Sequence, residues 1–90
     1  MTIKFSLFIT GRTERSENAI SHIKKICQEE FTDQYELSVI DVQEQPNLAE
    51  ERKIVVTPTL IKEFPLPETR LIGDLSDKIK VLRKKGSMAS

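Results

Sequence analysis

The stretch from Lys53 to Leu60, Lys-Ile-Val-Val-Thr-Pro-Thr-Leu, decides the fold of this 90-residue chain. Pro58 stands between two threonines, after an apolar run and before further apolar residues. Proline lacks a backbone N–H and has a fixed φ, so this position suits the entry to a strand. The local pattern alone fits an ordinary strand-start proline, because trans is the default at most X–Pro bonds. The context on either side therefore has to decide what Pro58 introduces.

Upstream of this stretch, the pattern predicts a strand, a helix and a second strand. Ile3–Ile9 is apolar at every second position, which is typical of a strand with one face in the core. From Ser16 to Phe31 apolar residues recur every three or four positions, which predicts an amphipathic helix of about four turns. Thr13 or Ser16 could cap this helix. Tyr35–Val42 alternates again, so the three elements form a right-handed parallel unit.

Around and after Pro58, the pattern predicts a short helix, a hairpin and a final helix. Asn47 followed three residues later by Glu50 matches a helix cap, and the helix has room for about two turns. Thr59–Phe64 and Thr69–Ile72 read as strands, and the prolines between them indicate a turn. Residues 75–84 return to helical periodicity.

The order of these elements, βαβαββα, predicts an α/β, thioredoxin-like fold with a mixed four-stranded sheet. In such folds a cis proline introduces a strand at the place of Pro58. We expect one domain over residues 1–85, because a chain of this length forms a single core. Residues 86–90 are small and polar, which predicts a disordered tail or a leftover of the expression vector.

Composition and charge narrow the classes of function. Lysine and arginine number 14, as do aspartate and glutamate, so no basic field attracts nucleic acid. The longest apolar runs are too short to cross a bilayer. The N-terminus lacks the features of a secretory signal, and the single cysteine cannot form an internal disulfide. We therefore expect a cytoplasmic protein with neither nucleic acid nor membrane as partner.

Enzymatic chemistry finds little support in the residues. Oxidoreductases of this fold place Cys-x-x-Cys at the start of the first helix, but Thr10–Ser16 contains no cysteine. Cys27 lies on the apolar stripe and reads as an inert core residue. His22 reads as a solvated helix residue. The sequence therefore predicts no catalytic residue and no cofactor. It also predicts no metal site, because the acidic residues that could form one are better explained as a helix cap and a solvated face. These residues are Asp41, Glu50 and Glu51.

Four segments, in this order and spacing, resemble the KaiB family of circadian-clock proteins. The resemblance runs from about Phe5 to Leu82. The sensor domain of the clock histidine kinase SasA is similar as well. The segments are Ser38–Val42, Pro46–Glu51, Thr57–Leu60 and Leu71–Ser76.

The resemblance implies a choice between two folds. KaiB proteins share the N-terminal half, whereas the C-terminal half takes either a tetramer-forming ground state or the thioredoxin-like state that binds the hexameric ATPase KaiC. Members that rest in the ground state carry a glycine and an acidic residue where this chain has Lys84 and Gly86. Lysine favours helix over glycine by roughly 0.7 kcal/mol. We therefore expect the thioredoxin-like state, a cis Thr57–Pro58 bond and mainly monomers, with a tetramer or dimer as the mark of the ground state.

The resemblance also implies partner-binding residues. Lys53, Lys62 and Arg70 match basic positions that KaiB proteins use against KaiC, although charge alone favours a simple role in solubility. Three other positions depart from the family pattern: Asn18, Glu36 and Ser38. Two of these positions are basic in cyanobacterial members. The loss of two positive charges should weaken association and slow the encounter with the partner, since charges at the rim of an interface act chiefly on the association rate.

Together these features predict a non-enzymatic circadian-clock or clock-derived regulator that binds a KaiC-like ATPase. Two alternatives stay open. One is a sensor-type module that recruits the same ATPase for a histidine kinase. The other is a thioredoxin-like thiol protein with one cysteine.

Overall fold

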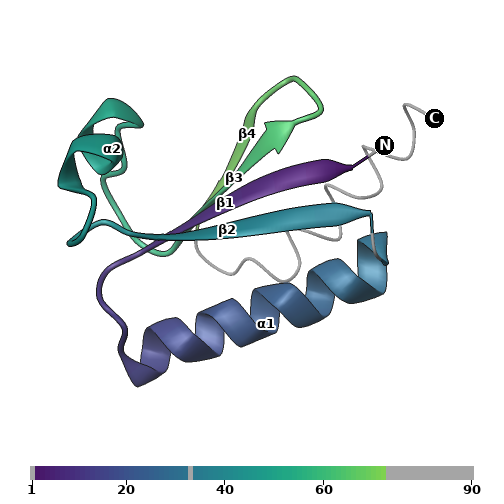
Figure 1. The fold of residues 1–90 in the computed structure, drawn as a ribbon, viewed down its shortest axis with the longest axis horizontal. Coiled ribbons are helices and arrows are strands. Elements are labelled where there is room, and N and C mark those ends of the chain that lie inside the picture. Colours follow the sequence, from purple (N-terminus) through teal and green to yellow (C-terminus); the bar gives the residue numbers. More distant parts are fainter. Residues whose placement is uncertain (1, 33, 73–90) are drawn as a thin grey trace.

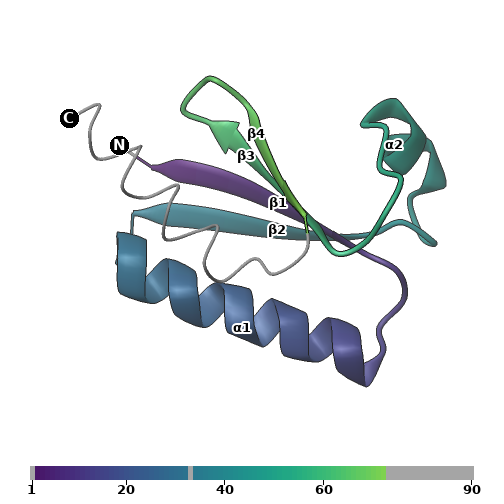
Figure 2. The same ribbon diagram turned by 180° about the vertical axis from the view of Figure 1, so that it is seen from behind.

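The computed structural model describes residues 2–32 and 34–72, which form a four-stranded mixed sheet and two helices (Figure 1). Helix α1 runs along one face of the sheet, and α2 lies on the opposite side near one end, as the reverse view confirms (Figure 2). The elements are β1 (Ile3–Ile9), α1 (Glu14–Phe31), β2 (Tyr35–Asp41), α2 (Pro46–Glu51), β3 (Thr59–Phe64) and β4 (Thr69–Ile72).

The sheet has the strand order β2-β1-β3-β4. Strand β1 pairs in parallel with β2, with Leu7 opposite Val39, and antiparallel with β3, with Leu7 opposite Leu60. The β3–β4 hairpin places Leu60 opposite Leu71. These pairings confirm the predicted parallel unit followed by an antiparallel hairpin.

The main core lies between α1 and the sheet. It forms because the odd-numbered residues of β1 and the apolar stripe of α1 face one another, and fully burying each such large side chain stabilises the fold by about 1.5–3 kcal/mol. A second apolar layer, with Phe8 and Ile61, occupies the other face. The core between α1 and the sheet contains Phe5, Leu7, Ile9, Ile20, Ile23, Ile26, Cys27 and Leu60.

The predicted element bounds agree closely with the structure, with one error. Three strands have the predicted limits, and Thr13 is the cap of α1, since its hydroxyl oxygen accepts a hydrogen bond from Ser16 N at 3.1 Å. The prediction that Asn47 caps α2 is wrong. The cap position is Gln45, whose side chain makes no capping bond, and Pro46 opens the helix. Proline suits that position because its fixed φ is already helical and its missing N–H would lack a helical partner.

The Thr57–Pro58 bond is cis, as predicted. As far as β4, the element order is that of a thioredoxin-like fold. The predicted helix over 75–84, the fold-state residues Lys84 and Gly86, and the predicted tail over 86–90 lie outside the described residues. Within residues 2–32 and 34–72, neither helix is long and apolar enough to cross a membrane.

Candidate functional site

Lys53 lies where α2 ends and the chain turns toward β3. Its φ of 55° is left-handed, a conformation that normally selects glycine at the end of a helix. The Lys53 N–H donates to the Glu50 carbonyl at 3.0 Å, and the Ile54 N–H donates to the Ala49 carbonyl at 2.9 Å. These two bonds are those of a Schellman motif. The Lys53 side chain is exposed and forms no ion pair with any residue of 2–32 or 34–72.

Arg70, in β4, meets the end of α2. Its guanidinium donates to the main-chain carbonyl of Lys53 at 3.3 Å and also to that of Arg52. Its Nε lies 3.7 Å from a Glu68 carboxylate oxygen, and its side chain is 35% exposed. Carbonyls at a helix end have no partner within the helix, so Arg70 satisfies them from the neighbouring strand.

Arg52 joins α2 to the β3–β4 hairpin by ion pairs. Its guanidinium donates to both carboxylate oxygens of Glu63, at 2.8 and 3.1 Å, and to Glu68 at 3.0 Å. Burial of Glu63 raises the pKa of its carboxyl, but hydrogen bonds from Arg52 and Ser6 outweigh it, so the pKa is lowered overall. The hydrogen bond to Glu63 is also the main cause that raises the pKa of Arg52. The pair is therefore charged across the neutral pH range.

Lys62 lies apart from the other two basic residues predicted to bind a partner. It is 8% exposed, and it lies opposite Phe5 of β1 and two positions after Leu60, on the face that α1 covers. Arg70 pairs instead with Ile61 and turns to the α2 side. The structure thus brings Arg70 to Lys53 and leaves Lys62 on the other face of the sheet.

Two exposed apolar residues lie two and three positions after Lys53. Val55 is 90% exposed and Val56 is 42% exposed, although both are large aliphatic side chains. A lysine beside such residues offers a partner protein one positive charge and adjoining apolar surface. This combination suits recognition of an acidic surface that also carries apolar groups.

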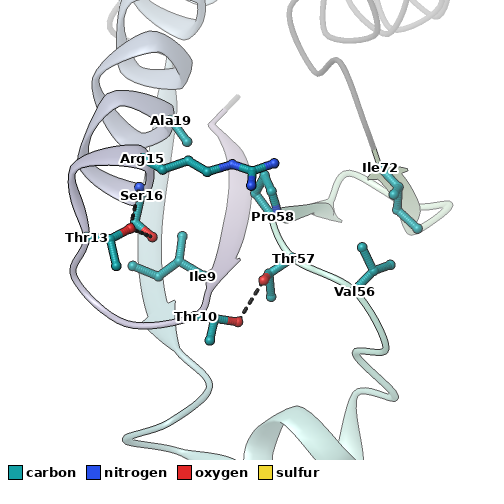
Figure 3. Close-up of a pocket in the computed structure, with 10 residues that line it drawn as sticks. All are labelled: Ile9, Thr10, Thr13, Arg15, Ser16, Ala19, Val56, Thr57, Pro58 and Ile72. Atoms are coloured by element: carbon teal, nitrogen blue, oxygen red, sulfur yellow. Dashed lines mark hydrogen bonds between the residues drawn. The ribbon is translucent and has the colours of Figure 1, made fainter.

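A cavity of about 480 Å³ opens beside Pro58, between the end of β1 and the start of α1 (Figure 3). The Thr10 and Thr57 hydroxyls, 2.7 Å apart, hydrogen-bond at this opening (Figure 3). Hydroxyl groups, apolar side chains and the guanidinium of Arg15 line the cavity. No described lining residue is a cysteine, so the cavity lacks the thiol that dithiol exchange requires.

Cys27 is fully buried in the core, as predicted. Burial raises the pKa of its thiol to about 12, so the thiolate nucleophile does not form at neutral pH. Among the described residues, no three His, Cys, Asp or Glu side chains lie close enough together to hold a metal ion. The prediction that places Asp41 on a solvated face is wrong, because Asp41 is buried and accepts hydrogen bonds from the Gly11 and Gln43 N–H groups, which is a structural role.

Sequence reasoning missed Arg52. Its carboxylate partners lie 11 and 16 residues away along the chain, so no local pattern pairs them. It also missed the left-handed turn at Lys53, because a lysine gives no signal where glycine would. The prediction that Lys53 closes the helix was close, since α2 ends at Glu51 and Arg52 is its C-terminal cap.

Known proteins resemble this chain in both sequence and structure. The KaiB domain family matches residues 6–85. Circadian clock protein KaiB3 of Synechocystis is 56% identical over 80 residues, which cover 89% of this chain and 78% of that protein. Circadian clock oscillator protein KaiB of Synechococcus elongatus is 51% identical over 81 residues, covering 90% and 79%.

Solved structures support the thioredoxin-like fold. The N-terminal domain of Synechococcus elongatus SasA superposes with a TM-score of 0.85 at 30% identity, covering 100% of this chain and 87% of that one. Chloroplastic thioredoxin z superposes with a TM-score of 0.73 at 22% identity, covering 93% and 77%. The second likeness concerns the fold alone.

Proposed function

Because the chain belongs to the KaiB family, we propose that it is a non-enzymatic clock regulator that binds a KaiC-like ATPase in its thioredoxin-like state. Lys53 is the basic residue that we place in the contact. Arg70 donates a hydrogen bond to the main-chain carbonyl of Lys53. Lys62 lies on the other face of the sheet, so a partner that reaches that face contacts only the small exposed part of its side chain. We expect the binding form to be monomeric, with no cofactor.

One observation carries this proposal, namely an exposed lysine in a left-handed conformation. The left-handed region costs an ordinary L-residue about 1–2 kcal/mol, and glycine avoids this. Lys53 accepts that cost without forming an ion pair with any residue that the structure describes. Strained residues of this kind are typical of functional positions. A partner protein that pairs an acidic group with the Lys53 ammonium would explain why lysine, and not glycine, occupies position 53.

Charge reversal at Lys53 tests the proposal. We expect Lys53→Glu to weaken binding to purified KaiC hexamers from Synechocystis by more than tenfold, about 1.4 kcal/mol, because it replaces an attraction by a repulsion. The loss should shrink at higher salt, since exposed charges are screened. Lys25→Glu is the matched control, because Lys25 is exposed on α1. Equal affinities of the two variants would contradict the proposed contact.

Lys62→Glu is a less direct test. Lys62 is largely buried, so reversing its charge also places an unpaired carboxylate among core residues and destabilises the fold. A loss of binding in that variant counts as evidence of contact only if the unfolding midpoint is unchanged.

A second candidate is a sensor-type module that recruits the ATPase for a histidine kinase. The superposition on the SasA domain favours it. The rate of ATP hydrolysis by KaiC separates the two candidates. A regulator changes this rate on binding, whereas a recruiting module leaves it unchanged. The one-cysteine thiol protein receives less support, because Cys27 is buried away from solvent.

A further inference from the structure

A side chain of β4, that of Arg70, hydrogen-bonds the main chain at the end of α2. The Schellman motif satisfies the Ala49 and Glu50 carbonyls from within the turn. The carbonyls of Arg52 and Lys53 point beyond it, and both accept hydrogen bonds from the guanidinium of Arg70 in β4. The main chain of Lys53 is therefore fixed to the hairpin by a residue 17 positions later.

The same guanidinium belongs to a chain of ion pairs. Arg70 lies beside Glu68, Glu68 accepts from Arg52, and Arg52 also donates to Glu63 in β3. These contacts hold both the side chain and the carbonyl of Arg52, so α2 cannot rotate against the hairpin without breaking several charged contacts. Two arginines and two glutamates balance within this group. Lys53, which forms no ion pair with any described residue, adjoins this group in the chain.

We infer that Arg70 is a positioning residue for Lys53, holding it in its left-handed turn so that its side chain faces a partner. This inference rests on the proposed function, because it assigns the partner contact to Lys53 and a supporting role to Arg70. Arginine suits this role since its planar group donates to two acceptors at once. Lysine at position 70 would retain the charge, but its single ammonium group cannot reproduce the paired hydrogen bonds that the guanidinium donates to the Arg52 and Lys53 carbonyls.

A double-mutant cycle tests this inference by KaiC binding. We expect Arg70→Ala and Lys53→Ala each to weaken binding to KaiC hexamers by roughly tenfold, and the double variant to bind no worse than Lys53→Ala alone, because coupled residues are not additive. Arg70→Lys should lie between the unmutated protein and Arg70→Ala. Arg12→Ala is the matched control, since Arg12 forms its ion pair with Glu17 of α1 and not with the α2–hairpin group. Additive losses at positions 53 and 70 would mean that Arg70 touches the partner itself, and would overturn the inference.

Amide hydrogen exchange tests the same inference without a partner. In Arg70→Ala, the Lys53 and Ile54 amides should exchange at least tenfold faster, whereas the core amides of β1 should change only as much as the global stability does. Unchanged exchange at Lys53 and Ile54 would overturn the positioning role. If the unmutated protein does not bind KaiC, the proposed function fails, and the exchange result still decides whether Arg70 holds Lys53.

Discussion

The buried carboxylate of Asp41 accepts a hydrogen bond from the Gly11 N–H at 3.0 Å and so ties the end of β2 to the loop after β1. Asp41 also accepts from the Gln43 N–H at 2.9 Å. These bonds hold Gly11 at a φ of 70°, where an added Cβ would lie 3.1 Å from Gln43 Oε1. The loop that leads into α1 therefore depends on a glycine for both conformation and space.

Gly11→Ala should lower the free energy of unfolding by about 1–2 kcal/mol, because alanine is strained at positive φ and crowds Gln43. Urea denaturation followed by circular dichroism measures the change. Gly11→Asn should lose less, since asparagine tolerates the left-handed region better. An alanine variant as stable as the unmutated protein would show that the loop adapts.

Lys53→Gly should be more stable than Lys53→Ala by about 0.5–1 kcal/mol. Glycine relieves the left-handed strain at position 53, whereas alanine keeps it, and the flexibility of glycine in the unfolded chain offsets part of the gain. Both variants lack the charge, so the comparison isolates the backbone. Equal unfolding midpoints in urea would argue against a strained turn.

Acidification should weaken the Arg52–Glu63 pair. The folded-state pKa of Glu63 lies below its unfolded value, so the pair contributes stability at neutral pH that is lost as pH falls through the folded-state pKa. Glu63→Gln should therefore be less stable than the unmutated protein at pH 7, and this difference should shrink toward pH 3. Glu29→Gln, at an exposed position of α1, serves as control. A difference between Glu63→Gln and the unmutated protein that persists at pH 3 would contradict the role of the ion pair.

Cys27 should not react with a thiol reagent in the folded protein. Burial raises its pKa to about 12 and blocks access, so labelling should appear only as the protein unfolds in urea. Cys27→Ala should retain the fold and lower the free energy of unfolding by about 1–2 kcal/mol through lost packing. Rapid labelling in native buffer, or disulfide reductase activity of the unmutated protein, would contradict an inert thiol.

Periodicity was sufficient to predict most of the fold. The alternation in Ile3–Ile9 gives this strand an apolar face, and the spacing of apolar residues gives α1 an apolar stripe; packing the helix on the sheet buries both. The prolines after Phe64 mark the turn of the hairpin. The start of α2 was misplaced because Asn47 has the chemistry of a cap, while Pro46 just before it can open a helix without one.

The sequence by itself determined the element order as far as β4, the buried cysteine and the lack of a dithiol motif, because these depend on local pattern and residue type. Only the tertiary structure decided which basic residues meet. A shift of one position along a strand moves a side chain to the other face, so Lys62 lies against the core while Arg70, from the neighbouring strand, reaches the Lys53 carbonyl. Such contacts depend on strand register and on the place where α2 ends against the hairpin, and neither is encoded in a short stretch of residues.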